Sequence, residues 1–478
     1  MNILDYFPAG LTPRPEQAVA LLELQKQWRH ADVFAITAST GAGKTEVALT
    51  IAAWQEAMGC TTNIVMPNNG LVKQTLDRYP DTPVLHRQAE YTCETHGTCK
   101  DGHNANKFAC KGCPYSKAKR GITRSKVRLM NYHIYWAHKL YATNLVIDEA
   151  HSLINLFSST REVALWHSKH KFPTGMRVAS DAVKWAQEEI KKTNDAKLET
   201  FLIELLRMNN NTAVEYENGV YYGKDDIKLK AYSVTQGSVP PWLWPPHKVR
   251  KVILMSATIG MEDVKELGLD NRRVALIECA SPIPPERRQL IYEPYVKVKH
   301  DLLDYAVPRL AHKIREKLAL HPEKGLIHAP YALAARLRQE LDDPRLIWHE
   351  RHNKAAKLQQ FRDAPNGAVL VASGMYEGID LPYDTARWQV ISRVPYPSLG
   401  NMFIKMKMED NPDWYSWQTI KALIQATGRI TRAADDFGVT YIFDSSFGNL
   451  LKQDDARDNP MFPASIRIAI ITKRAEVT

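Results

Sequence analysis

A glycine-rich segment near the N-terminus, AITASTGAGKT, has the residue types of a phosphate-binding loop. It follows an apolar stretch and opens a pattern typical of a helix, which is the setting that such a loop requires. Gly41 and Gly43 let backbone N–H groups surround phosphate oxygens at the start of the helix. Lys44 adds a positive charge, and the Thr45 hydroxyl can bind Mg²⁺. The strict pattern has glycine where this chain has Ala38, so an ordinary glycine-rich turn is the alternative.

Two carboxylates follow an apolar stretch further along the chain, in the segment LVIDEAH. Beside a phosphate loop, Asp148 is expected to hold Mg²⁺, usually through water, and Glu149 to position and polarise an attacking water. A lone Asp-Glu pair is also typical of a solvated turn. The phosphate loop upstream favours the catalytic interpretation.

Two later segments complete this set. QATGRITR places Gln425, Arg429 and Arg432 at i, i+4 and i+7, which predicts one helical face whose guanidinium groups reach a nucleotide phosphate. An ordinary basic helix face is the alternative. SATI, at residues 256–259, is predicted to end a strand, where its hydroxyls can sense the bound nucleotide.

Four of the six cysteines lie in one window with the spacing C-x5-C-x10-C-x2-C, at Cys93, Cys99, Cys110 and Cys113. Four thiolates in a loop-rich segment can hold an iron–sulfur cubane or a tetrahedral Zn²⁺. The Cys-Pro ending favours iron–sulfur. His96 and His103 are available to zinc, and four free thiols are the third possibility.

A basic stretch follows the cysteines directly. Residues 115–128 carry six basic and no acidic side chains, and they are predicted to line a groove for nucleic-acid phosphates: Lys117, Lys119, Arg120, Arg124, Lys126 and Arg128. A solvated charged helix is the alternative. Tyr132 is predicted to stack on a base, although its spacing from other aromatic residues is also typical of core packing.

The elements that must position these residues form two similar blocks. From about residue 33 to 151, and again from about 287, short apolar segments alternate with helix-length segments. This alternation predicts an α/β fold with two parallel sheets. Between the blocks, residues 152–236 are expected to form helices and a hairpin turning at Asn218 and Gly219. The segment RKVILMSAT is expected to rejoin the first sheet.

Composition sets the remaining limits. At ~150 residues per domain, 478 residues are enough for about three domains. The net charge of +10 favours a polyanionic partner or plain solubility. No apolar run approaches the ~20 residues that span a bilayer, and MNILDYFPAG does not have the pattern of a signal peptide, so a cytoplasmic location is expected.

Taken in order, ASTGAGKT, DEAH, SAT and QATGRITR resemble the motifs of superfamily 2 helicases. Further segments resemble XPD/DinG-type helicases over residues 10–447: RPEQ at 14–17, NYHIYW at 131–136, HAPY at 328–331, ASGMYEGIDLPYD at 372–384 and VPYPS at 394–398. The four cysteines before DEAH and the insertion after it also occur at the places where that family has them.

The resemblance implies two RecA-like P-loop domains that share ATP and Mg²⁺, with a four-cysteine [4Fe–4S] insertion and a short, mainly helical arch-like insertion in the first. The implied boundaries are domain 1 at 1–80, 129–151 and 237–286, the cysteine insertion at 81–128, the arch-like insertion at 152–236, and domain 2 at 287–478. The implied nucleotide-binding residues are Arg14, Gln17, Thr40, Gly41, Ala42, Gly43, Lys44, Thr45, Glu377, Gly378 and Asp380.

The implied activity is ATP-dependent unwinding by a monomer that moves 5′ to 3′ on single-stranded DNA, with forked or tailed duplexes as substrates. Two alternatives remain. One is an RNA or RNA–DNA hybrid remodeller with a zinc insert, and the other is a nucleic-acid-binding subunit that uses ATP only as a switch. The chain departs from the family at Asn68 and Asn69, which replace threonines, and at Tyr383, which replaces a usual glycine.

Overall fold

The structure is a computed structural model. It describes residues 1–478 except 40, 94–95, 106–112, 155–162, 177–178, 209–211, 222–223, 234–242, 376–380, 432 and 474–478. The chain divides into two compact units: Met1–Thr37, Gly43–Cys279 and Ser398–Trp414 form the first, and Ala38–Ala42, Ala280–Pro397 and Tyr415–Thr478 form the second. Within the described residues, no helix combines the length and apolar character needed to cross a bilayer.

The first unit is built on a six-stranded sheet. Its strand order is β11 (Val274–Cys279), β1 (Val33–Ala38), β10 (Lys251–Ser256), β6 (Asn144–Ile147), β2 (Thr62–Met66) and β5 (Val127–Asn131). The strands from β1 to β5 in this order pair in parallel. The predicted return of RKVILMSAT to the first sheet is therefore confirmed, and β10 lies between β1 and β6.

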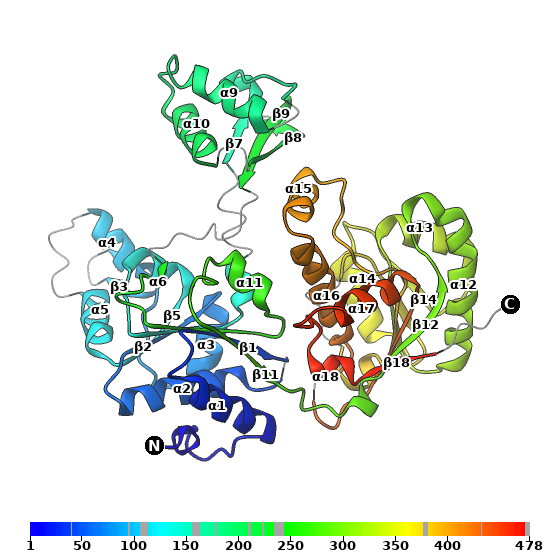
Figure 1. Cartoon of the computed structure of the whole chain (residues 1–478), viewed down its shortest axis with the longest axis horizontal. Coiled ribbons are helices and arrows are strands. Elements are labelled where there is room, and N and C mark those ends of the chain that lie inside the picture. Colours follow the sequence, from blue (N-terminus) through cyan, green and yellow to red (C-terminus); the bar gives the residue numbers. More distant parts are fainter. Residues whose placement is uncertain are drawn as a thin grey trace. The chain divides into compact units, whose positions relative to one another are not determined.

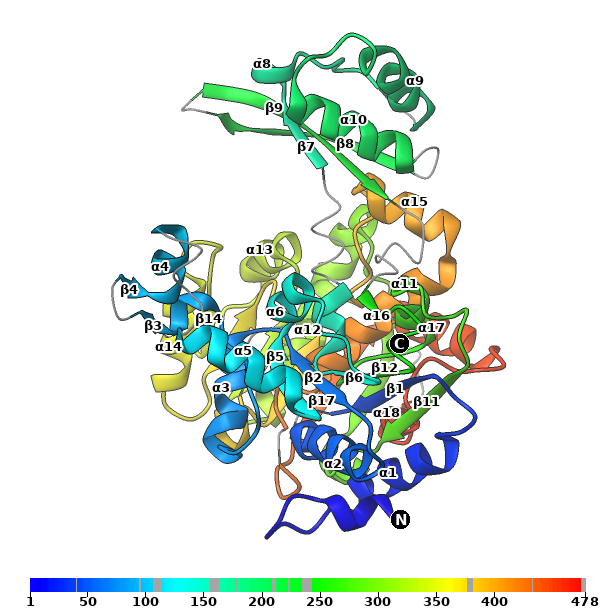
Figure 2. The ribbon, with the colours of Figure 1, turned by 90° about the vertical axis from the view of Figure 1, so that its left-hand side faces the viewer.

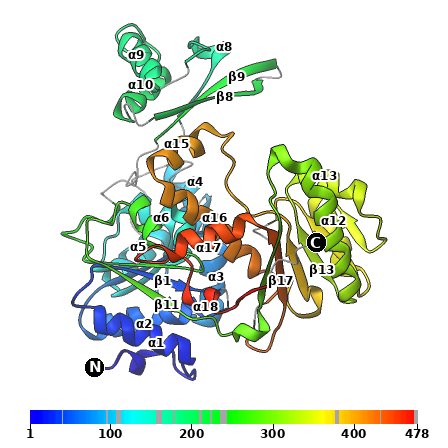
Figure 3. The ribbon, with the colours of Figure 1, turned by 45° about the vertical axis from the view of Figure 1, so that its right-hand side comes forward.

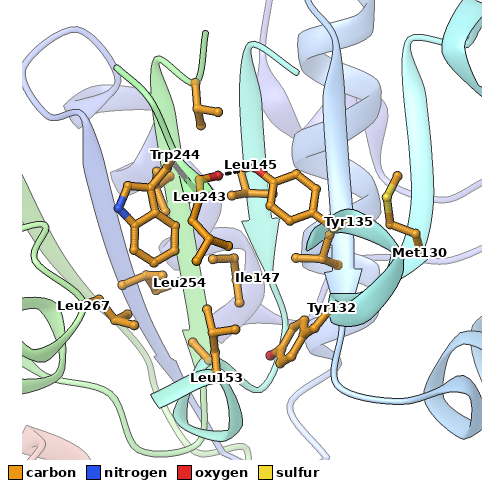
Figure 4. Close-up of a cluster of buried hydrophobic side chains, with 14 of the residues drawn as sticks. Met130, Tyr132, Tyr135, Leu145, Ile147, Leu153, Leu243, Trp244, Leu254 and Leu267 are labelled. Atoms are coloured by element: carbon orange, nitrogen blue, oxygen red, sulfur yellow. Dashed lines mark hydrogen bonds between the residues drawn. The ribbon is translucent and has the colours of Figure 1, made fainter. Parts of the chain in front are cut away.

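Helices cover both faces of this sheet. α1 (Pro15–Gln27) and α2 (Lys44–Ala57) lie on one side, and α6 (Tyr132–His138) and α11 (Met261–Glu266) lie on the other (Figure 1). On the α6 side, Leu145 and Ile147 of β6 alternate into a core that also contains Leu254, Tyr135 and Trp244 (Figure 4). The period of two in β6 thus directs alternate side chains toward α6.

The cysteine segment lies on the side of β5, the edge strand of this sheet, and has a two-stranded sheet of its own (Figure 2). It comprises β3 (Thr92–Cys93), β4 (Gly97–Thr98), α4 (Cys99–Ala105) and α5 (Pro114–Arg124). Tyr115 and Ile122 of α5 and Cys99 of α4 are buried in the same core as α6. The segment is therefore held to the first unit by ordinary hydrophobic packing.

The second insertion has its own small sheet and core. Its elements are β7 (Val163–Trp166), α8 (His167–His170), α9 (Ala179–Glu189), α10 (Ala196–Met208), β8 (Thr212–Tyr221) and β9 (Lys224–Ser233). The predicted helices and hairpin are present, but the predicted turn position is wrong. Asn218 and Gly219 lie inside β8 and pair with Ile227 and Asp226, because strand pairing continues past them to Tyr221.

The second unit is built on seven parallel strands. Their order is β14 (Leu346–Trp348), β15 (Val369–Ala372), β13 (Gly325–His328), β16 (Trp388–Ile391), β17 (Val439–Asp444), β12 (Leu290–Val296) and β18 (Ile470–Thr472). The predicted α/β fold with two parallel sheets is confirmed.

Helices cover this sheet on both faces as well. α12 (Leu303–Leu320) and α13 (Tyr331–Glu340) lie on one face, and α16 (Pro412–Thr427) and α17 (Ser446–Asp455) on the other (Figure 3). Tyr441 and Phe443 of β17 pack with α12 and α13, whereas Ile442 between them packs with α16 and α17. The remaining helices of this unit are α14 (Lys354–Asp363) and α18 (Ala464–Arg467).

One segment differs from the predicted division at residue 287. Residues Ser398–Trp414, which carry α15 (Met402–Asp410), group with the first unit. Lys407 Nζ lies 2.5 Å from Glu266 Oε1, and the two side chains are 2% and 7% exposed. Asn411 donates to Glu262 Oε2 at 2.6 Å. α15 also contacts β8 of the arch-like insertion, so contacts with two parts of the first unit hold the segment there.

Tyr383, the residue that replaces a usual glycine, has a left-handed backbone with φ +54°. A side chain with a Cβ is strained there, which is the physical reason for glycine at this place. Asp436 holds the strained residue by accepting from Tyr383 N–H at 3.2 Å. The same carboxylate accepts from Arg387 Nη1 at 2.8 Å and is fully buried.

We expect Asp436→Ala to destabilise the protein by about 2–3 kcal/mol, because it removes the acceptor of a strained N–H and leaves Arg387 with only an exposed carboxylate and a backbone carbonyl. Asp384→Ala is the matched control, since Asp384 also pairs with Arg387, at 2.9 Å, but is 94% exposed. Urea unfolding measures both. Equal, small losses of unfolding free energy in the two variants would show that Asp436 does not stabilise the turn at Tyr383.

Candidate nucleotide site

The phosphate-binding loop has the conformation that its glycines allow. Gly41 and Gly43 have φ values of +82° and +77°, and Gly43 is the N-cap of α2. A Cβ on Gly43 would lie 2.2 Å from Gln17 Nε2 and 2.9 Å from Glu46 Oε2. Both the backbone angle and the lack of space therefore require glycine at this position. Thr40 lies outside the described residues.

Gln17, predicted from the resemblance to bind the nucleotide, lies against this loop. Its Nε2 donates to the Gly43 carbonyl at 3.3 Å, and its Oε1 accepts from Arg14 N–H at 2.9 Å. Gln17 is 3% exposed. The start of α1 and the start of α2 are thus joined through one buried amide.

Lys44, Glu149 and Ser256 converge although they lie far apart in sequence. Lys44 Nζ is 3.0 Å from Glu149 Oε1. His151 Nδ1 is 3.3 Å from Glu149 Oε2 and 2.8 Å from Ser256 Oγ. His151 was not among the predicted site residues. Its position in the DEAH segment could have indicated a role at the site. In the structure, His151 links Glu149 to Ser256 of the SAT segment.

Asp148 and Thr45 were predicted to share Mg²⁺. Both residues line one small recess, together with Met66, Leu71, Gln74, Thr75 and Arg78. Asp148 is 5% exposed, and burial raises its pKa to about 6 against the opposing charge of Lys44. A divalent cation next to this carboxylate would favour its ionised form.

Glu149 has the opposite electrostatic balance. Burial opposes its ionisation, but the hydrogen bond from His151 and the charge of Lys44 outweigh burial and lower its pKa to about 2. Neighbouring carboxylates with pKa values moved in opposite directions are typical of acid–base sites. The arrangement provides a phosphate-binding cation, a carboxylate pair and a loop that binds anions, which is a set suited to phosphoryl transfer.

The second unit carries part of the QATGRITR segment. The prediction of one helical face is wrong, because α16 ends at Thr427 and Arg429 follows it in a turn. Gln389 of β16 donates to the carbonyls of Ala426 and Thr427 at 3.0 and 3.3 Å, at the end of that helix. Gln425 lies in the last turn of α16. Arg432, Glu377, Gly378 and Asp380 lie outside the described residues.

Three of the four predicted cysteine ligands are described, and Cys110 is not. Cys99 Sγ and Cys113 Sγ are 3.5 Å apart. A Cβ on Gly102 would lie 2.6 Å from Cys93 Sγ, so α4 leaves room for this thiol only because that residue is glycine. Within the described residues, no three His, Cys, Asp or Glu side chains gather closely enough to hold a metal ion.

Cys113 has the electrostatic setting of a ligand. It is the N-cap of α5, and its Sγ accepts from Ser116 N–H at 3.3 Å. Burial opposes ionisation of this thiol, but contacts with the Ser116 hydroxyl and amide lower its pKa overall. A thiolate is the form that binds metals, so the described thiols fit a soft metal or an iron–sulfur group.

Two family models and several solved structures match this chain. The model "Helicase C-terminal domain" matches residues 327–455, and "Type III restriction enzyme, res subunit" matches residues 10–177. The solved structure "XPD_Helicase" aligns over 96% of this chain and 99% of its own, with a TM-score of 0.58 and 14% identity. The S. tokodaii Xpd4 structure aligns over 96% and 100%, with a TM-score of 0.56 and 12% identity. In its fold and in its domain matches, the chain is similar to XPD/DinG-like superfamily 2 helicases.

The curated relatives match this chain locally. It is 33% identical to "ATP-dependent DNA helicase YoaA" of Escherichia coli over 24% of this chain and 19% of that protein. It is 29% identical to the "Regulator of telomere elongation helicase 1 homolog" of Anopheles gambiae, over 25% of this chain and 14% of that protein. The matched segments thus span less than a fifth of either relative's length.

The predicted nucleic-acid residues of this XPD/DinG-like chain separate into two groups. Five stay at or near the surface of α5 and the turn after it: Lys117, Lys119, Arg120, Arg124 and Lys126. Of these, Lys119 is half-buried, and its Nζ lies 3.3 Å from His138 Nδ1.

Arg128 and Tyr132 are placed differently from the prediction. Arg128 is 8% exposed and donates to the carbonyls of Ser125, Tyr141 and Thr123 at 2.9, 3.2 and 3.0 Å. Its guanidinium is therefore occupied by backbone groups. Tyr132 is 4% exposed and packs in the core, so its ring is not available to a base.

We expect Arg128→Met to lower the free energy of unfolding by about 2–4 kcal/mol, because three backbone carbonyls lose a charged donor. Arg124→Met, at an exposed position of α5, is the matched control and is expected to change it little. Urea unfolding gives both values. A stable Arg128→Met variant with weakened strand binding would restore the original prediction for Arg128.

Proposed function

We propose that this chain hydrolyses ATP with Mg²⁺ and uses the cycle to move 5′ to 3′ along single-stranded DNA and to unwind forked or tailed duplexes. The observation that carries the proposal is the convergence of Lys44, Glu149 and Ser256 through His151. These contacts join the phosphate loop, the carboxylates and the SAT segment at the carboxyl ends of β1, β6 and β10.

In the proposed reaction, Lys44 binds the β- and γ-phosphates, and Thr45 and Asp148 hold Mg²⁺. Glu149 is ionised and can accept the proton of a water whose oxygen bonds to the γ-phosphorus as the bond to the ADP oxygen breaks. Gln425, Arg429 and Arg432 are proposed to stabilise the phosphate charge, on the strength of their motif.

The His151–Ser256 contact supports a link between hydrolysis and the strand. When the charge near Glu149 changes, His151 is the side chain that faces both the carboxylate and SAT. α11, which follows SAT, is bound to α15 through Glu266 and Lys407. We propose that Lys117, Lys119, Arg120, Arg124 and Lys126 bind strand phosphates.

We further propose that Cys93, Cys99, Cys110 and Cys113 hold a [4Fe–4S] cluster, since the described thiols fit such a group. When bound, the cluster would cross-link α4 to the start of α5, and so brace the basic surface. No step of hydrolysis depends on it.

We expect purified protein to unwind 5′-tailed and forked DNA but not 3′-tailed DNA. Lys44→Ala and Glu149→Gln should lower strand-stimulated hydrolysis by roughly 10²-fold or more and abolish unwinding. Lys44→Ala should also weaken nucleotide binding, whereas Glu149→Gln should retain it. Hydrolysis and strand-displacement assays measure these effects.

Glu56→Gln is the matched control, because Glu56 is an exposed carboxylate at the far end of α2. Hydrolysis without unwinding of any substrate would favour an ATP-dependent switch in a larger assembly. Preference for RNA-containing duplexes would favour a remodeller of RNA or hybrids. Normal unwinding by Glu149→Gln would refute the proposed base.

For the cysteines, we expect anaerobically purified protein to be coloured and to contain about four iron and four sulfide per chain. Cys99→Ser should lose most of this iron, and Cys60→Ser, which changes a cysteine far from the window, should not. Metal and sulfide analysis decide the matter. Colourless, zinc-loaded and active protein would contradict the cluster.

A further inference from the structure

We infer that Tyr132 is a positioning residue for the proposed hydrolysis: its hydroxyl holds the backbone of the DEAH turn so that the Glu149 carboxylate faces Lys44. This inference rests on the proposed function, but its structural part can be tested without activity. It replaces the base-stacking role that the sequence suggested.

The contact is direct and buried. Tyr132 Oη lies within hydrogen-bond distance of the Asp148 carbonyl and 3.0 Å from the Glu149 carbonyl. The hydroxyl has one proton, so two consecutive carbonyls of the turn share one donor.

The backbone that Tyr132 contacts is strained at Glu149. Glu149 has φ +48°, in the left-handed region that disfavours residues with a Cβ. The conformation persists only if its surroundings fix it. The carboxylate is fixed by Lys44 and His151, and the carbonyl by the Tyr132 hydroxyl and by Ser152 N–H at 2.8 Å. Removing one carbonyl contact should loosen the turn while the side-chain contacts remain.

The helix that carries Tyr132 is anchored at both ends. Asn131 accepts from Ile134 N–H at 2.8 Å as the N-cap of α6, and its amide donates to Asn69 Oδ1 at 2.5 Å. At the other end, His138 Nε2 is 2.6 Å from the Tyr115 hydroxyl of α5. A hydroxyl on so well-fixed a helix is a rigid support for the turn.

The same helix provides a matched comparison. Tyr135 is 3% exposed against 4% for Tyr132, and its hydroxyl donates to the Leu243 carbonyl at 2.5 Å, away from the DEAH turn. Figure 4 shows both rings in one core, with the bond from Tyr135 to Leu243 dashed. Loss of either hydroxyl removes a buried bond to a carbonyl, but only one of these bonds reaches Glu149.

The experiment compares Tyr132→Phe with Tyr135→Phe in the full chain. Both changes keep the ring and should lower the melting temperature to a similar extent. Only Tyr132→Phe should lower kcat of strand-stimulated ATP hydrolysis, by about tenfold, the value of one hydrogen bond. KM for ATP should stay within about twofold, because the groups that bind phosphate are untouched.

Hydrogen exchange of the Ser152 amide, measured on protein without nucleotide, is the readout that needs no activity. It should speed up in Tyr132→Phe and not in Tyr135→Phe. Unchanged exchange and kcat in Tyr132→Phe, or an equal loss of kcat in both variants, would overturn the inference. Faster exchange in Tyr132→Phe of a protein whose wild type hydrolyses no ATP would refute the proposed function and leave Tyr132 as the support of the turn.

Discussion

The ion pair between Lys44 and Glu149 is the contact on which the site depends, and the order of strands in the first sheet makes it possible. Lys44 follows β1, Glu149 follows β6, and Ser256 ends β10, which lies between them. Neighbouring parallel strands end at the same edge of a sheet, so three segments that are distant in sequence meet there. The arrangement requires β10 to return after two insertions and pair with β1 and β6. Any change that displaced β10 would separate SAT from the carboxylates, even with every motif intact.

Much of this was predictable from sequence, because buried parallel strands are short apolar runs and each motif stands directly after one. Sequence spacing could not show where a neighbouring strand makes hydrogen bonds to the predicted helix or turn. The spacing of Gln425, Arg429 and Arg432 suggests a continuous helix, yet Gln389 from a neighbouring strand bonds to the last carbonyls of α16. Likewise Asn218-Gly219 is a strong turn signal, but pairing with Asp226 and Ile227 keeps it inside a strand. In β8, strand pairing outweighed the local turn preference of Asn218-Gly219.

Charge and aromatic character proved ambiguous for a similar reason. In sequence, Arg128 continues a run of basic residues. In the structure it is the second residue of β5, and its side chain donates to the carbonyls of Thr123 and Tyr141. Tyr132 begins the next helix, where the first turn faces the sheet rather than solvent. Residue type can suggest a phosphate or base contact, but burial decides whether the group is available. Arg128 and Tyr132 lie near the two ends of β5. Because both are buried there, they make structural contacts in place of the predicted contacts with nucleic acid.

The two insertions of the first unit are stabilised in different ways, and this limits what a bound cluster has to do. The arch-like insertion has a core of its own, with Leu165, Phe201 and Leu229 fully or almost fully buried. The cysteine segment instead shares the core of the sheet through Tyr115 and Ile122. α5 is thus fixed by packing and by the Tyr115–His138 bond, whatever the cysteines hold. A cluster is therefore not needed to hold α5, and its loss should affect the basic face of α5 less than it affects α4.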